Sequence, residues 1–164
     1  MLNTGTAAGI QILPDKLVLV NVRRGFRDFS IKQSAVLEDF KEAPVAEMRN
    51  KLRQQIQNGA VKSENLVLGL PAEEVMLRLI ELPIEVEENL DQVVRFQVEK
   101  FEPSEEERSY YDYVVLSRDE AQKKILLQIA MVRQSLLNDY VMLLKELGLT
   151  PSAVRLSSLA LHQL

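Results

Sequence analysis

The chain has no cysteine among its 164 residues and only one histidine, His162. The absence of cysteine excludes a disulfide framework, a thiolate metal site and a cysteine nucleophile. A single histidine argues against a histidine-based catalytic triad and against a metal site with several histidine ligands. Long apolar runs are absent as well. Segments such as Leu17–Val20 and Tyr140–Leu144 are far shorter than the roughly 18–20 residues that a membrane-spanning helix needs.

The chain also has little excess charge. Its 20 basic and 24 acidic residues give a formal net charge of −4, and the isoelectric point is near 5.2. A mildly acidic protein is a poor general ligand for a nucleic-acid backbone. Hydrophobic residues make up 46% and charged residues 27%, the balance of a soluble globular protein with one domain or two small subdomains. Residues 1–9 have neither a basic nor an apolar region, which predicts no signal peptide and favours the cytoplasm.

In the first 70 residues, apolar segments bounded by turn residues predict β-strands, and one stretch changes to helical spacing. Val45, Met48 and Leu52 recur three and four residues apart, with Pro44 in the first turn and Asn58-Gly59 as a C-cap. We therefore expect a sheet with one helix. Its strands are expected at Gly9–Leu13, Lys16–Arg23, Phe26–Val36 and Asn65–Leu70.

The second block centres on a helix expected at Glu85–Phe101. Its apolar stripe is expected to contain Leu90, Val93, Val94, Phe96, Val98 and Phe101. Further strands are expected at Glu74–Leu82, Ser109–Ser117, Lys123–Val132 and Ala153–Leu156. Further helices are expected at Gln134–Leu147, with Gly148 as its C-cap, and from Ser157 to Leu164. The apolar residues of this last helix cannot bury themselves, so they return to the first block or the chain belongs to a longer protein.

Short stretches in a fixed order carry a family resemblance over roughly residues 65–164. They are Gly69–Pro71, Arg78–Pro83, Glu88–Pro103, Asp112–Leu116, Leu127–Val132, Tyr140–Leu149 and Val154–Leu161. In these stretches the chain resembles the PilM family of type IV pilus assembly proteins and, more distantly, the cytoplasmic region of GspL from type II secretion. Both belong to the actin-like ATPase superfamily and resemble the cell-division protein FtsA in architecture.

The resemblance implies an α+β fold. It would be half of an actin-like (FtsA/PilM-like) fold, a mixed sheet with helices plus an inserted smaller α/β subdomain. Residues 1–74 and 152–164 would form subdomain 1A, and residues 75–151 would form the inserted subdomain 1C. The resemblance also implies a longer protein, whose second half (subdomains 2A and 2B) closes a nucleotide cleft.

The resemblance further implies a non-enzymatic scaffold at the cytoplasmic side of a bacterial inner membrane. One implied partner is the N-terminal domain of the assembly or secretion ATPase, as for GspL. Another is an inner-membrane protein, PilN-like as for PilM or else GspM-like, and a homodimer is a further candidate. No cofactor, metal or nucleic acid is expected. The alternative is the N-terminal half of an active actin-like ATP-binding protein.

That alternative depends on the first hairpin. Actin-like ATPases carry an Asp-x-Gly pattern there, in which Asp orients metal-bound water and Gly lets backbone amides approach phosphate. Alignment of Gly9-Ile10 with the family's first strand places Gln11 at the Asp position and Leu13 at the Gly position. Gln11 carries no charge, Leu13 adds a Cβ, and Asp15 follows too late in the hairpin. The phosphate loop is therefore expected to be degenerate, as on the GspL side of the resemblance, where nucleotide binding is not expected.

The partner-binding candidates lie in the second block and are Arg78, Glu81, Arg95, Glu99 and Tyr111. Arg95 and Glu99 stand four residues apart on one helical face, and both surface decoration and an interface fit this pair. Tyr111 belongs to a cluster of tyrosines, for which core packing and an interface are both open interpretations.

Two other charged groups have simpler interpretations. Acidic residues such as Glu87 and Glu88 at the start of the same helix are typical of a solvated face rather than of acid–base chemistry. Arg23, Arg24 and Arg27 gather near one hairpin, and either acidic lipid or an acidic patch of a partner fits them.

Overall fold

The computed structural model of the protein describes residues 5–25, 28–40, 42–55, 65–102, 104 and 107–157. The chain divides into two compact units. Unit 1 comprises Met1–Ala72 and Asp139–Leu164, and unit 2 comprises Glu73–Asn138. The first boundary follows residue 72, where the family resemblance implies residue 74. The second boundary lies within helix α3 (Gln134–Glu146), where the resemblance implies residue 151.

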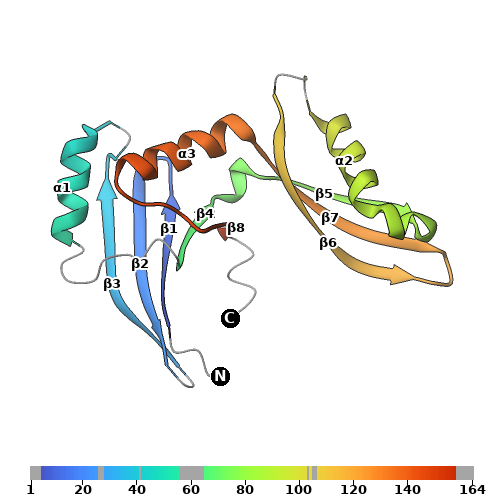
Figure 1. The fold of residues 1–164 in the computed structure, drawn as a ribbon, viewed down its shortest axis with the longest axis horizontal. Helices are drawn as coiled ribbons and strands as arrows, with labels where there is room; N and C mark the ends of the chain where they lie inside the picture. The colour runs from blue at the N-terminus through green and yellow to red at the C-terminus, as the bar shows by residue number, and fades with distance from the viewer. Residues whose placement is uncertain are drawn as a thin grey trace. The chain divides into compact units, whose positions relative to one another are not determined.

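Unit 1 is built on a five-stranded mixed sheet with the order β3-β2-β1-β4-β8 (Figure 1). The first three strands form an antiparallel meander, whereas β4 pairs in parallel with β1 and β8 pairs in parallel with β4. Val and Leu dominate β2 and β4, as is typical of strands buried in a sheet, whereas β1 carries Ile10 and Ile12 among small residues. The strands are β1 (Thr6–Ile12), β2 (Lys16–Arg24), β3 (Phe29–Glu38), β4 (Leu66–Leu70) and β8 (Ala153–Leu156).

Alternation along the strands creates the core of unit 1. Ile10 and Ile12 of β1 lie on the same side as their β2 partners Leu19 and Leu17, and all four side chains are buried. Further buried side chains come from helix α1 (Val45–Gln55) and from the part of α3 in this unit. They are Met48, Leu52, Tyr140 and Leu144.

The end of α3 has the expected glycine cap. Gly148 has a positive φ of 82°, its N–H donates to the Lys145 carbonyl at 2.9 Å, and the Leu149 N–H donates to the Leu144 carbonyl at 2.8 Å. These two bonds form a Schellman motif, in which glycine adopts the left-handed conformation without a steric penalty. The helix therefore ends here.

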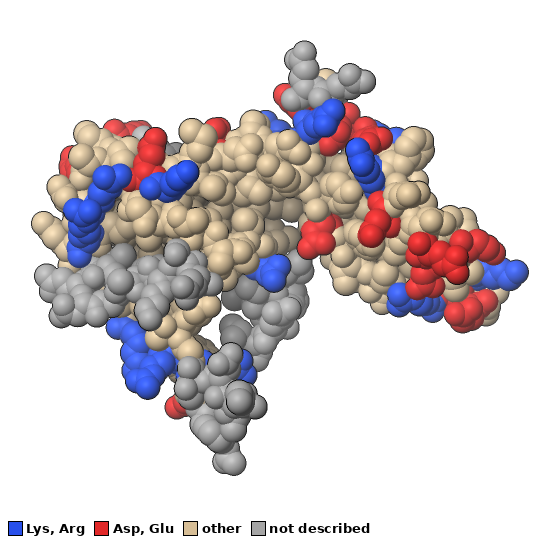
Figure 2. Space-filling view, in the orientation of Figure 1, with Lys and Arg blue, Asp and Glu red and all other residues tan. Residues whose placement is uncertain are grey.

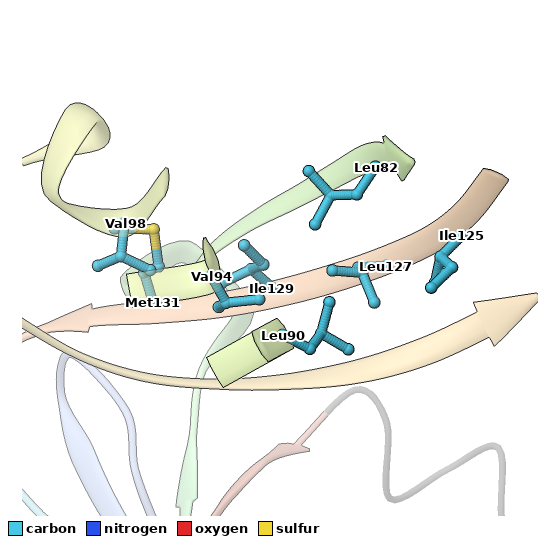
Figure 3. Close-up of a cluster of buried hydrophobic side chains, with 8 residues drawn as sticks. All are labelled: Leu82, Leu90, Val94, Val98, Ile125, Leu127, Ile129 and Met131. Atoms are coloured by element: carbon cyan, nitrogen blue, oxygen red, sulfur yellow. The ribbon is translucent and has the colours of Figure 1, made fainter. Parts of the chain in front are cut away.

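Unit 2 is a three-stranded antiparallel sheet with the order β5-β7-β6. Helix α2 (Leu90–Phe101) and the short 3-10 helix η3 (Ile84–Asn89) contribute to its core (Figure 1). The strands are β5 (Met76–Pro83), β6 (Ser109–Asp119) and β7 (Lys124–Arg133). Figure 3 shows the buried side chains of α2 and of the sheet in one cluster. They are Leu82, Leu90, Val94, Val98, Ile125, Leu127, Ile129 and Met131.

The structure corrects two expectations about α2. The sequence predicts one helix over Glu85–Phe101, but η3 occupies the first part and α2 begins only at Leu90. The sequence also predicts Phe96 in the apolar stripe, whereas its side chain is 58% exposed. Phe96 follows the buried Val94 by two positions, which places it about 200° around the helix axis. The Lys100 Nζ lies 4.4 Å from the centroid of the Phe96 ring instead.

Several strand ends also differ from the expected ones. β5 begins at Met76 because Ala72–Glu74 form a 3-10 turn, η2. β3 runs to Glu38 and β6 runs to Asp119, because their antiparallel pairing continues that far. β7 is shifted by one residue to Lys124–Arg133, where Arg133 pairs with Ser109. The expected C-cap at Asn58-Gly59 and the expected helix beyond Ser157 lie outside the described residues.

Candidate interaction surface

The outward face of α2 carries two of the expected partner-binding residues. Leu90, Val94 and Val98 are buried in the core, which directs Arg95 and Glu99 outward. The Arg95 Nε lies 3.3 Å from the Glu99 Oε1, and both side chains are exposed. An exposed pair of this kind contributes only about 0.3–0.5 kcal/mol to stability. Both charges therefore remain available to a partner at little cost.

A groove with a volume of about 670 Å³ lies beside this face, within unit 2. Residues from α2, from the start of β6 and from the start of α3 line it. Three of the five candidates, Arg95, Glu99 and Tyr111, belong to this lining, so the fold brings them together. We call this feature the docking groove. Its other lining residues are Val98, Glu102, Ser104, Arg108, Ser109 and Gln134.

Hydrogen bonds fix the walls of the docking groove. The Ser109 N–H donates to the Glu102 Oε1 at 2.7 Å, which joins the end of α2 to the start of β6. The Gln134 N–H donates to the Arg108 carbonyl at 2.9 Å, and its side-chain amide donates to the Ser109 carbonyl at 3.5 Å. These contacts tie α3 to the same corner. Preorganisation of this kind lowers the entropy that binding would otherwise cost.

The docking groove presents charges of both signs. Glu99 is paired with Arg95, and Glu102 accepts the Ser109 N–H. Arg108 is exposed and forms no ion pair with any other described residue. A simple anion would meet the carboxylates here as well as the guanidinium groups. A peptide with charges of both signs fits this lining better.

A second concave feature, of about 420 Å³, lies where β5 begins. We call it the apolar hollow, because Val75, Met76, Phe101 and Met131 supply much of its lining. Ser109 lines both the hollow and the docking groove, so the two features adjoin. Its remaining lining residues are Glu73, Glu74 and Arg133.

The other two candidates lie on opposite faces of the unit 2 sheet. Arg78 pairs with Ile129 on the face of the core, and its Cζ lies 5.4 Å from the Phe101 ring centroid, beside the apolar hollow. Glu81 pairs with Leu126, which places it on the face away from the core. Its carboxylate lies 2.9 Å from the Lys124 Nζ, and this hydrogen bond raises the pKa of Lys124. Glu81 therefore does not belong to the docking groove.

The tyrosine cluster separates into different roles. The Tyr113 hydroxyl donates to the Asp91 carboxylate of α2, and this bond raises the pKa of Tyr113. Tyr111 lies on the same face of β6, is 39% exposed and lines the docking groove. Tyr110 lies on the opposite face, and its hydroxyl donates to the Asn138 side chain at 3.4 Å. Packing thus explains Tyr113, whereas Tyr111 is available to a partner.

The hairpin between β1 and β2 contains the two expected phosphate-loop positions. Gln11 lies on β1 opposite Val18, and the Leu13 N–H donates to the Lys16 carbonyl at 2.8 Å. The Leu13 amide is thus committed to the turn. Among the described residues, no helix has the length and apolar character to cross a membrane. No group of three or more acidic or histidine side chains in that part of the chain is placed to hold a metal ion.

Comparisons with known proteins give a match at the level of structure. No protein-family model and no curated protein sequence matches the chain. A chain of the solved "PilM-PilN type IV pilus biogenesis complex" matches 94% of this chain over 48% of its own length, with a TM-score of 0.71 and 20% identity. The cytoplasmic domain of EpsL, an inner-membrane component of the type II secretion system of Vibrio cholerae, matches 92% over 57% of its length, with a TM-score of 0.56 and 13% identity.

The fold is that of half a PilM-like chain. The matches confirm the expected α+β class and agree with the sequence resemblance to the PilM/GspL family. The chain spans only about half the length of the solved chains that it matches. A mixed sheet with a smaller inserted α/β unit is the arrangement expected for half of an actin-like fold.

Six of the nine lining residues of the docking groove were not partner-binding candidates from the sequence, and Glu102, Arg108 and Gln134 are the most polar of them. No local pattern marks them, because they meet only when the starts of β6 and α3 hydrogen-bond at the end of α2. Helical spacing was a sufficient signal for Arg95 and Glu99 alone.

Proposed function

We propose that this chain is a docking scaffold, and not an enzyme, in the inner-membrane platform of a type IV pilus or type II secretion system. It acts at the cytoplasmic side of a bacterial inner membrane. The fold that it shares with proteins of those two systems supports this proposal. The absence of charge at Gln11 and of glycine at position 13 is consistent with a role other than ATP hydrolysis.

One observation carries the proposal, namely that the docking groove adjoins the apolar hollow. The groove offers Arg95, Glu99 and Arg108 for charged contacts and Tyr111 for an aromatic contact. The hollow offers apolar lining for an anchoring side chain. Protein interfaces combine apolar anchors with a polar rim, and Tyr and Arg are enriched at their most important positions. A short segment with one apolar anchor and flanking charges fits both features together.

We assign this combined site to a short cytoplasmic segment of a PilN-like or GspM-like inner-membrane protein. The solved complex of PilM with PilN supports a partner of the first kind. The N-terminal domain of the assembly or secretion ATPase is a folded partner and needs a broader surface. The face of the unit 2 sheet away from the core is suited to it, because Leu77, Leu79 and Val114 are exposed there. A homodimer would use the same apolar face.

Calorimetric titration tests this assignment. The chain is titrated separately with a peptide covering the cytoplasmic segment of the cognate PilN-like protein and with the N-terminal domain of the cognate ATPase. We expect binding with a Kd of about 1 µM or below for at least one of them. Binding of neither probe would contradict the scaffold proposal.

Substitutions then separate the two surfaces. Arg108→Glu with Tyr111→Ala is expected to weaken binding of the peptide by about tenfold or more and to leave binding of the ATPase domain unchanged. Leu79→Asp with Val114→Asp is expected to weaken binding of the ATPase domain and to leave binding of the peptide unchanged. Sedimentation of the same variants reports whether the apolar sheet face mediates a homodimer instead. If both pairs of substitutions act on the same probe, the assignment of two surfaces is wrong.

The alternative, half of an ATP-binding protein, has its own test. A thermal-shift measurement with Mg-ATP is made on a longer protein that includes the second half implied by the resemblance. Because a ligand that binds only the folded state raises its stability, true binding at about 100 times Kd would add about 2.7 kcal/mol. We expect no shift. A clear rise in Tm would favour the ATPase alternative over the scaffold.

A further inference from the structure

The end of the β2–β3 hairpin in unit 1 carries features that the docking groove does not explain. Val22 pairs there with Ile31, and Arg24 pairs with Phe29, so these four side chains share one face of the hairpin. Ile31 is 64% exposed and Phe29 is 63% exposed, the two highest values among the exposed large hydrophobic side chains that the structure describes. Two adjacent apolar side chains left in water indicate an interaction site.

Basic side chains lie on both faces of this hairpin end: Arg24 shares the face of Phe29 and Ile31, whereas Arg23 pairs with Ser30 on the opposite face. Arg23, Arg24 and Lys32 are all exposed, and none of them forms an ion pair with another described residue. Figure 2 shows Lys and Arg side chains gathered where β2 ends and β3 begins, away from α1. Asp28 is the acidic residue described at this end. The hairpin end is therefore locally cationic, although the whole chain has a net charge of −4.

Backbone hydrogen bonds hold the hairpin end in place. The Arg24 N–H donates to the Gly5 carbonyl at 2.9 Å, and the Gly25 N–H donates to the Asp28 carbonyl at 2.8 Å. Parallel pairing with β4 begins only at Ala8 of β1, so the hairpin end extends beyond that part of the sheet. Its side chains thus project from a fixed strand end, and they belong to neither the docking groove nor the apolar hollow.

We propose that this hairpin end is a peripheral contact for an anionic lipid surface. Phe29 and Ile31 enter the interfacial region of the bilayer, while Arg23, Arg24 and Lys32 contact the phosphate headgroups. Exposed aromatic and aliphatic side chains beside unpaired cations are the combination that interfacial anchors use. An acidic segment of a protein would pair with the cations but would leave the two projecting apolar side chains without a complementary cavity. The proposal does not depend on the function of the docking groove.

Co-sedimentation of the 164-residue chain with lipid vesicles tests the proposal. We expect binding to phosphatidylcholine vesicles that contain phosphatidylglycerol and little binding to pure phosphatidylcholine vesicles. Arg24→Gln with Lys32→Gln is expected to lower the partition coefficient roughly 25-fold, because each basic residue at an anionic surface contributes about fivefold. Phe29→Ser with Ile31→Ser is expected to lower it about tenfold. Salt of about 1 M, where the Debye length is about 3 Å, should abolish binding by the chain and by both variants.

A matched control removes the same charge elsewhere. Arg53→Gln of α1 with Lys145→Gln of α3, both exposed and outside the docking groove and the apolar hollow, should leave vesicle binding unchanged, and circular dichroism verifies that every variant is folded. Equal losses for the control and the hairpin variant would overturn the proposal, as would the absence of binding to anionic vesicles. Binding of soluble polyglutamate in place of vesicles, with the same dependence on Arg24 and Lys32, would assign the hairpin end to an acidic protein partner. None of these readouts involves the peptide or ATPase-domain titrations, so the two proposals fail separately.

Discussion

The two faces of α2 have opposite environments although both come from the same twelve consecutive residues. The inward face, with Val94 and Val98, is buried in the core of unit 2 and supplies stability. The outward face, with Arg95, Phe96 and Glu99, is exposed and contributes little to stability, and Arg95 and Glu99 line the docking groove. Substitutions on the inward side should therefore lower the stability of the unit strongly, whereas substitutions on the outward side should change binding with little loss of stability.

The largest effect is expected from the core that α2 covers. Leu127 is fully buried at the centre of this core, so Leu127→Ala is expected to cost about 2–5 kcal/mol of unfolding free energy. Urea denaturation followed by circular dichroism measures the loss. Leu79→Ala, on the other face of the same sheet, is the control and should stay within about 0.5 kcal/mol. Equal losses of unfolding free energy at Leu127 and Leu79 would mean that both faces of the sheet are buried.

The outward charges give the next largest effect, which is on binding. Arg95→Glu with Glu99→Arg keeps the net charge and reverses the pair into the more favourable order on the helix. We expect a partner of the docking groove to bind about tenfold more weakly, because its charges now meet the wrong signs. The Tm should not fall.

The Lys51–Glu47 pair of α1 offers the matched control for this reversal, since it has the same spacing and a distance of 2.8 Å. Lys51→Glu with Glu47→Lys should leave the affinity unchanged. An unchanged affinity for the α2 variant too would remove α2 from the interface.

Phe96 and Val94 allow the outward and inward faces of α2 to be compared at single residues, with a smaller expected effect. The Phe96 ring contacts Lys100 and is mostly exposed, so Phe96→Ser is expected to cost about 0.5–1 kcal/mol, the range of an exposed cation–π contact. Val94→Ser, two residues away and fully buried, should cost clearly more. Urea denaturation of the two variants measures both losses of unfolding free energy, so that they can be compared directly. If Phe96→Ser lowered the unfolding free energy as much as Val94→Ser, Phe96 would be buried, as the sequence predicts.

The smallest effect concerns pH. The hydrogen bond to Asp91 favours the neutral phenol of Tyr113 and raises its pKa above the ordinary value of 10.0. The bond therefore stabilises the fold fully below pH 10, and this contribution is lost as the pH rises through the raised pKa. Ultraviolet titration of the tyrosines should show one phenol ionising above the others. Asp91→Asn should bring that phenol back toward the rest, and an unchanged titration would indicate that the bond does not form in solution.

Much of the fold was predictable because local patterns dominate it. β2, β8 and α1 follow from apolar runs and helical spacing, and the C-cap at Gly148 follows from glycine's access to positive φ. Phe96 and the division of residues 85–101 into η3 and α2 were not predictable, because an apolar residue type does not state which side of a helix meets the sheet. The candidate site shows the same limit. Spacing identified the Arg95–Glu99 pair, but it gave no sign that Arg108 and Gln134 would lie beside it.

By itself, the sequence determined the kinds of elements, their order, and the classes of chemistry excluded by the lack of cysteine and the presence of a single histidine. These properties depend on residue type and on neighbours within a few positions, so they can be derived without the fold. Only the tertiary structure decided which charged and aromatic side chains share the docking groove, that Glu81 lies on the other face of the sheet, and that Phe29 and Ile31 project beside exposed cations. Strand register and the packing of α2 make those choices, and both depend on contacts between residues far apart in the chain.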